Sequence, residues 1–134
     1  MALSDFVILP ALAMGIILGL LELYFVSKDE RGMHWLKHGL HALPVMFIFI
    51  FVAMNLSWAL GLAGLEDSAL IKYGVLAAIA IIAMVKVKAA ASITGKGGVG
   101  ESNIHVFIIG ILIAASPFIW ELLLEPMIGD MLPF

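Results

Sequence analysis

The stretch that decides the fold is residues 6–26, FVILPALAMGIILGLLELYFV, in which Glu22 is the only charged residue. About 20 consecutive, mostly apolar residues are enough for a helix to cross the hydrocarbon core of a bilayer. Lipid offers no partners for backbone N–H and C=O groups, so such a stretch must pair them internally as a helix. Residues 6–26 therefore predict a transmembrane helix, with Pro10 in its first turn, where proline is tolerated.

Three further stretches have the same length and character, at residues 42–62, 69–89 and 104–124. Pro44 lies near the start of the second stretch, and Ser116-Pro117 lies inside the fourth, where a kink is expected. The sequence therefore predicts an all-α integral membrane protein, with a single domain of four transmembrane helices over residues 1–134.

The composition of the chain agrees with a membrane protein. Apolar residues make up 63% and charged residues 13%, whereas soluble domains are about half apolar and about a quarter charged. A net charge of −3 argues against a nucleic-acid partner, which requires a basic surface. The absence of cysteine excludes disulfides, thiolate metal sites and a thiol nucleophile.

Basic residues predict the direction of the helices, because they favour the cytoplasmic side of a membrane. Only Lys72 belongs to the side of the second connection. The other six lie in or beside the first and third connections: Lys28, Arg31, Lys37, Lys86, Lys88 and Lys96. We therefore expect a multi-pass protein of the cell membrane, with loops one and three in the cytoplasm and both termini outside.

The third connection contains Gly95-Lys96-Gly97-Gly98-Val99-Gly100. Over these six residues it resembles the phosphate-binding loop of ParA/MinD-like ATPases, which implies nucleotide binding. That family continues with lysine and threonine, where this chain has Glu101 and Ser102, and a carboxylate there would repel phosphate. A predicted membrane helix, not a strand, precedes the loop, so we expect a turn that binds no nucleotide.

The first connection, SKDERGMHWLKHGLHALP (residues 27–44), carries histidines at helical spacing. At about 100° per residue, one side of a helix here is polar; it comprises Glu30, His34, His38 and His41. The other side is apolar; it comprises Met33, Leu36, Leu40 and Leu43. This pattern predicts a short amphipathic segment in the inner membrane surface, before Pro44 turns the chain into the bilayer.

These histidines also suggest a metal site, because imidazole binds transition metal ions. The predicted topology brings five candidate ligands to one membrane surface: His34, His38, His41, His105 and Glu22. The alternative is a polar surface that faces water, since the chain contains no HExxH motif or set of histidine boxes.

Glu22 itself is a candidate for proton or ion coupling, because an ionisable residue within a transmembrane segment is functional by default. It lies one turn from the inner end of its predicted helix, so it could instead reach water or pair with Lys28 or Arg31. Asn55 is the other strongly polar residue deep in a predicted helix, and we expect it to form a helix–helix hydrogen bond.

Small residues recur four apart in each predicted helix, and such rows let backbones pack closely in membranes. The rows are Ala11, Gly15 and Gly19; Ala53, Ser57 and Gly61; Gly74 and Ala78; and Gly110 and Ala114. They predict packing within the monomer or between copies.

Short loops, packing surfaces and the lack of a soluble catalytic domain favour an accessory or structural subunit of a larger membrane complex, without catalytic activity of its own. A first alternative is a small oligomeric transporter or channel with a carboxylate near the inner surface, which resembles the small multidrug transporters in outline. A second alternative is a metal-binding membrane subunit. The expected partners are the lipid bilayer and other membrane subunits or copies of the chain.

Overall fold

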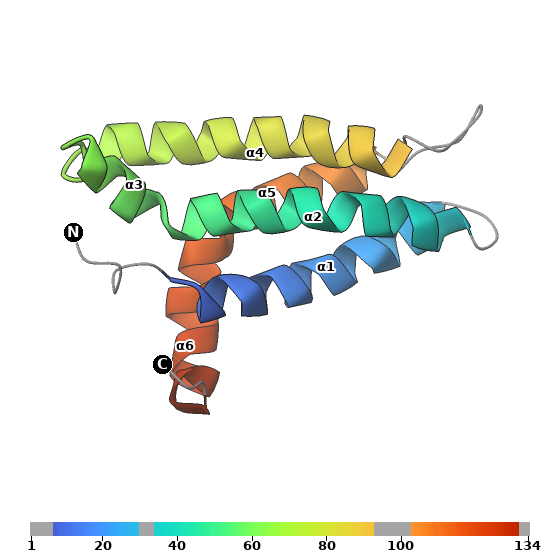
Figure 1. The fold of residues 1–134 in the computed structure, drawn as a ribbon, viewed down its shortest axis with the longest axis horizontal. Helices are drawn as coiled ribbons and strands as arrows, with labels where there is room; N and C mark the ends of the chain where they lie inside the picture. Colours follow the sequence, from blue (N-terminus) through green and yellow to red (C-terminus); the bar gives the residue numbers. More distant parts are fainter. Residues whose placement is uncertain (1–6, 30–33, 93–102, 132–134) are drawn as a thin grey trace.

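The computed structural model describes residues 7–29, 34–92 and 103–131. Within these residues every regular element is a helix, which confirms the predicted all-α fold. Four long helices lie along a common direction (Figure 1): α1 (Leu9–Asp29), α2 (His34–Met54), α4 (Ala69–Ser92) and α5 (Asn103–Ile119). The short helix α3 (Leu56–Leu62) follows α2, and α5 continues into the π-helical turn η2 (Trp120–Leu124), α6 (Glu125–Ile128) and the 3-10 turn η3 (Gly129–Met131).

Three of these helical stretches are each long and apolar enough to cross a membrane: Leu9–Lys28, Ala69–Ala89 and Asn103–Met131. The second predicted transmembrane helix is present as two pieces, α2 and α3, which meet at Asn55 with a bend of 62°. The described residues thus contain three candidate spans, or four if the bent pair is one span.

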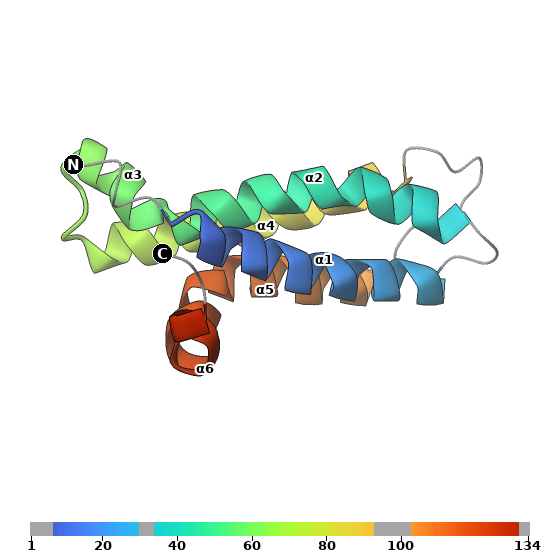
Figure 2. The same ribbon diagram turned by 60° about the horizontal axis from the view of Figure 1, so that its bottom comes forward.

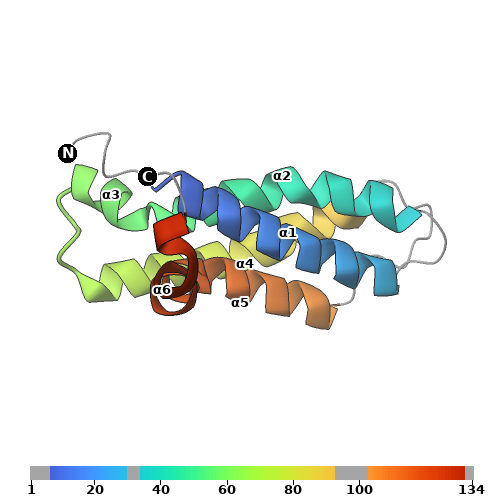
Figure 3. The ribbon, with the colours of Figure 1, turned by 90° about the horizontal axis from the view of Figure 1, so that it is seen from below.

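The long helices form an antiparallel bundle (Figures 2 and 3), in which α2 packs against α1, α4 and α5. Its two ends differ in charge. The basic end, at the right of Figure 1, carries Lys28, Lys37, Lys86 and Lys88, while the opposite end, the α3 end, carries α3 and the start of α1. The largest fully buried apolar side chains of the core are Met14, Met46, Ile50, Ile109 and Ile113.

The structure corrects the expectation of a separate amphipathic segment before Pro44. Helix α2 begins at His34 and continues through Pro44, which lies in its middle. Leu36 and Leu40, two residues of the expected apolar side, are exposed, while Gly39 is buried. A glycine at this position permits α1 to approach more closely than a leucine would.

The glycine-rich loop lies outside the described residues, as do Glu30, Arg31 and Lys96. The expectation that this loop is a turn without a nucleotide therefore stays a prediction. The expected change of direction near Ser116-Pro117 is present, since the chain turns away from the bundle between α5 and α6 (Figure 1).

Candidate functional site

Glu22 is completely buried inside the bundle, with an exposed fraction of 0%. It belongs to a row of residues four apart on α1, with Met14, Leu18 and Val26, and each member of this row is buried. Residues at this spacing share one side of a helix. Glu22 thus points where apolar core residues point, which corrects the expectation that it could reach water.

Along α1, Glu22 lies seven residues before the last residue, Asp29. At about 1.5 Å per residue, this places it about 10 Å from the basic end of the helix. The carboxylate is therefore within the bundle and nearer to the basic end than to the α3 end.

Glycines bring α2 close to α1 on both sides of this level. A Cβ at Gly19 would lie 2.9 Å from Leu43 of α2, and a Cβ at Gly39 would overlap the side chain of Leu23 of α1. Each glycine therefore accommodates a leucine from the other helix. The close packing of leucine on glycine surrounds the turn of α1 that carries Glu22.

Helix α5 contributes His105 one turn nearer to the basic end. Its imidazole stacks on the ring of Phe25, with ring centroids 4.3 Å apart and planes 2° from parallel. Phe25 follows Glu22 by three residues, so the two lie on neighbouring positions of α1. At the same end, the Lys88 ammonium of α4 donates a hydrogen bond to the side-chain carbonyl of Asn103.

The five candidate metal ligands occupy different environments. Glu22 is buried, His105 is half-buried, and His41 is exposed with its Nδ1 2.7 Å from the carbonyl oxygen of Lys37. The side chains of His34 and His38 lie outside the described part of the structure. Among the side chains that are described, no group of three His, Cys, Asp or Glu is placed to hold a metal ion. The metal site stays a prediction, which elemental analysis of the purified wild type and a His41→Ala variant tests.

The sequence offered two basic residues, Lys28 and Arg31, as partners for Glu22. Lys28 is exposed, and its ammonium lies 5.4 Å from the centroid of the Tyr24 ring, within the range of a cation–π contact. Arg31 lies outside the described residues.

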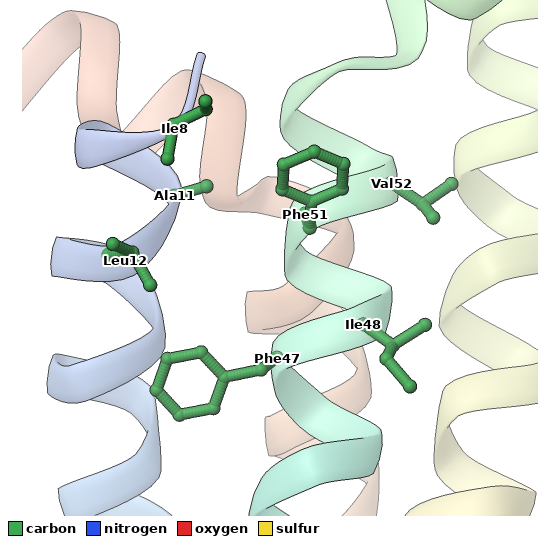
Figure 4. Close-up of a pocket in the computed structure, with 7 residues that line it drawn as sticks. All are labelled: Ile8, Ala11, Leu12, Phe47, Ile48, Phe51 and Val52. Carbon is green, nitrogen blue, oxygen red and sulfur yellow. The ribbon is translucent and has the colours of Figure 1, made fainter. Parts of the chain in front are cut away.

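An apolar groove of about 370 Å³ lies between α1 and α2, in the half of α1 opposite to Glu22 (Figure 4). Apolar side chains alone line it: Ile8, Ala11, Leu12, Phe47, Ile48, Phe51 and Val52. With no ionisable or hydrogen-bonding side chain in its lining, the groove suits a hydrocarbon group and offers nothing for acid–base chemistry. The shape of this groove depends on how two helices pack, which no local sequence pattern indicates.

The small residues predicted to pack helices have different surroundings. A Cβ at Gly15 would overlap the ring of Phe47 of α2, and a Cβ at Gly110 would overlap Met84 of α4. Gly74, by contrast, has open space beside it. In α3, Ser57 is exposed and Gly61 is half-buried.

Beside Gly74, a second apolar groove of about 240 Å³ runs between α4 and α5. It is lined by Tyr73, Leu76, Ala77, Ala80, Ile111, Ala114, Ala115 and Phe118. Four of these eight lining residues are alanines.

Asn55 has a structural role that differs from the expected helix–helix bond. Its side-chain oxygen accepts a hydrogen bond from the N–H of Val7 at 2.6 Å. Its side-chain nitrogen donates to the carbonyl oxygens of Val7 at 3.1 Å and Phe51 at 2.9 Å. Asn55 thus ties the break between α2 and α3 to the main chain before α1.

The chain matches no family model, no curated protein and no solved structure. Functional inference therefore depends on the chemistry of its own residues, and Glu22 is the residue whose placement most needs a functional explanation.

Proposed function

We propose that this protein is a small polytopic membrane protein that binds and releases a proton or a small cation at Glu22, as a transporter or channel does. The observation that carries the proposal is the complete burial of this carboxylate among helices that are long and apolar enough to cross a membrane. Of the three functions considered from sequence, transport and metal binding both use Glu22, whereas a structural subunit does not, and among the described side chains no group of three His, Cys, Asp or Glu is placed to hold a metal ion.

Energetic reasoning supports a functional role for Glu22. Removing an ionised carboxylate from water costs several kcal/mol even after the protein relaxes. Native domains are stable by only about 5–15 kcal/mol, so this cost is a large fraction of the total. A leucine or methionine at this position would fill the same space without the cost. Buried ionisable groups are accordingly candidates for proton or ion binding.

The basic end of the bundle offers a route by which a proton could reach Glu22. His105 lies one helical turn closer to that end, where its half-buried imidazole stacks on the ring of Phe25. Protonation of Glu22 would neutralise the carboxylate in place, which lowers the cost of its burial.

The charge pattern supports an orientation with the basic end in the cytoplasm. Four lysines lie at this end, and basic residues favour the cytoplasmic side. In this orientation, the nearer membrane surface is the cytoplasmic one, so Glu22 would bind and release its proton or cation on the cytoplasmic side. Both termini would lie outside.

A carbodiimide that is soluble in lipid provides a direct test, because it reacts with protonated carboxyls in apolar surroundings. The purified protein would be treated in liposomes at a series of pH values, and the modified residue identified by mass spectrometry. We expect modification of Glu22, increasing as pH falls, and none at the exposed Glu121 or Glu125. Glu22→Gln removes the site, while Glu121→Gln is the matched control.

Proton flux would be measured in the same liposomes with a trapped pH-sensitive dye. We expect Glu22→Gln to abolish a pH-gradient-driven flux that Glu121→Gln retains. Unmodified Glu22 at every pH, together with equal flux in wild type and Glu22→Gln, would refute the proposal.

A second candidate function, a subunit of a larger membrane complex, is supported by a different observation. The groove between α4 and α5 contains four alanines, and Gly74 of α4 has open space beside it, which suits close packing of another transmembrane helix. Gentle extraction followed by native mass spectrometry tests it. Recovery of the chain alone, as a monodisperse monomer, would contradict this role. The proposed role of Glu22 would be unaffected, because the carbodiimide and flux experiments test it separately.

A further inference from the structure

The helical stretch at the C-terminal side is too long to be a straight transmembrane helix. It runs from Asn103 to Met131, 29 residues. At about 1.5 Å per residue, it would extend about 43 Å, whereas the hydrocarbon core is about 30 Å thick. The structure resolves the mismatch by a change of direction. Figure 1 shows α5 along the bundle and the following segment at a steep angle to it, and Figures 2 and 3 look more nearly along that segment.

Local structure explains where the chain turns. Pro117 lies inside α5 and cannot donate the main-chain hydrogen bond of a regular helix. The π-helical turn η2 follows directly, and both prolines and π-turns are known causes of helix bending. The Ser116 hydroxyl bonds to the carbonyl of Leu112 at 3.0 Å, which keeps this polar group paired in the buried bend.

One side of the transverse segment, residues Trp120–Met131, is anchored to the bundle. Trp120 is buried and belongs to the core, and Leu124 and Ile128 are half-buried against it. These three residues are four apart, so they form one stripe along the segment.

The two flanks of this stripe have opposite chemistry. Glu125 follows Leu124 and Leu123 precedes it, so in a helical segment the two lie on opposite sides of the stripe. Glu121 lies on the same flank as Glu125, and Met127 on that of Leu123. All four are exposed, with Leu123 at 60% and Met127 at 74%. Over residues 121–127 the segment is thus acidic on one flank and apolar on the other, and the exposed Asp130 lies beyond this stretch, in the 3-10 turn η3.

We propose that Trp120–Met131 is an interfacial helix that lies in the surface of the lipid bilayer at the α3 end of the bundle. The inference rests on the proposed insertion of the bundle in a membrane. If the bundle crosses the bilayer, a segment that runs across the bundle lies parallel to the membrane surface. Its acidic flank then faces water and the headgroups, and Leu123 and Met127 face the acyl chains.

Lipid is the occupant that these observations favour over a protein partner. The segment is the last part of the candidate span Asn103–Met131, and the α5 helix that precedes it also exposes apolar side chains, among them Phe107 and Ile111. Carboxylates on the opposite flank would have to be desolvated if a protein covered the segment, whereas an interfacial position leaves them in water. Because the polar flank is acidic, anionic lipid is not required for binding and should weaken it.

The absence of cysteine from the chain makes site-directed spin labelling straightforward. Single cysteines would replace Leu123, Met127, Glu121 and Glu125 in the full-length protein, reconstituted in phosphatidylcholine liposomes. Collision rates would be measured with oxygen, which concentrates in lipid, and with a water-soluble nickel chelate. We expect oxygen to dominate at positions 123 and 127 and the nickel chelate to dominate at 121 and 125, with at least a several-fold difference in the ratio.

Two reference positions calibrate the measurement. Ile111 is exposed on α5 and reports lipid, while Asp67 is exposed in the connection before α4 and reports water. If label at position 111 collides mainly with nickel, the bundle is not in the membrane and the inference fails with it. If position 111 reports lipid and positions 123 and 127 report water, the interfacial helix alone is wrong.

Protection of positions 123 and 127 from both reagents would also overturn the inference, because it would mean that protein covers this flank. The inference stands independently of the role of Glu22, since labels can report an interfacial helix whether or not Glu22 binds a proton. Increasing the share of anionic lipid supplies a further check. We expect the oxygen-to-nickel ratio at position 127 to fall, and no change at position 111.

Discussion

Two glycine-to-alanine substitutions, Gly110→Ala and Gly74→Ala, test the packing of the bundle most directly. At Gly110, a Cβ would overlap Met84 and would lie 2.9 Å from the carbonyl oxygen of Ala80, where ordinary contacts begin at 3.4 Å. Met84 can move, but the carbonyl belongs to the backbone of α4, so the two helices must separate. At Gly74, nothing lies within 4 Å of the added carbon.

The expected magnitude follows from two opposing effects. Replacing glycine by alanine inside a helix adds about 1 kcal/mol of stability at either position, so this gain cancels when the two variants are compared. Overpacking of a well-packed contact costs about 1–3 kcal/mol. We therefore expect Gly110→Ala to be less stable than Gly74→Ala by about 1–3 kcal/mol.

Equilibrium unfolding in mixed detergent micelles measures this difference; with Trp35 and Trp58 replaced by phenylalanine, the fluorescence of the buried Trp120 reports the core. Gly15→Ala gives a graded comparison. Its added carbon meets the ring of Phe47, which is a side chain and can move, so its stability should fall between the other two. Equal stability of Gly110→Ala and Gly74→Ala would refute the proposed contact between α4 and α5.

Three further predictions concern stability. Asn55→Ala should cost about 1–3 kcal/mol, because it leaves the main chain before α1 without its hydrogen bonds, and thermal unfolding in detergent would show a lower midpoint. Ile113→Ala should lower the free energy of unfolding by about 2–5 kcal/mol, because Ile113 is fully buried. Leu70→Ala, at an exposed position, should change it by less than about 0.5 kcal/mol. Similar losses in both variants would contradict the assigned core. His105→Ala should lose about 0.5–1.5 kcal/mol of stacking on Phe25, which His105→Phe should restore; a double-mutant cycle with Phe25→Ala measures the coupling.

Glu22 illustrates what a local pattern can and cannot reveal. The sequence identified it as the one charged residue of an apolar stretch, which is a local property. Its burial was not predictable, because other apolar residues occur on all sides of α1 and no polar side indicates the direction of the core. Leu20 is 63% exposed and Glu22 is 0% exposed, although hydropathy alone favours the opposite.

The histidines of the first connection show a second limit. Their helical spacing predicted a separate interfacial segment, on the assumption that Pro44 ends a helix. In the structure α2 passes through Pro44, because a helix can lose one main-chain hydrogen bond when packing against its neighbours supports it. Gly39, although glycine is a poor helix former, is the residue at which Leu23 of α1 packs.

The sequence by itself determined the helical character of the chain and the positions of its candidate spans, because these depend on runs of apolar residues and on backbone hydrogen bonds that are local. The predicted stretch 69–89 coincides with the apolar part of α4, and 104–124 with α5 and η2. Tertiary structure alone decided that Glu22 is buried, that Gly110 packs and Gly74 does not, and that the last helical segment runs across the bundle. Each of these depends on which side of one helix contacts another. When a helix is apolar on all sides, its sequence pattern does not indicate which side faces the neighbouring helix.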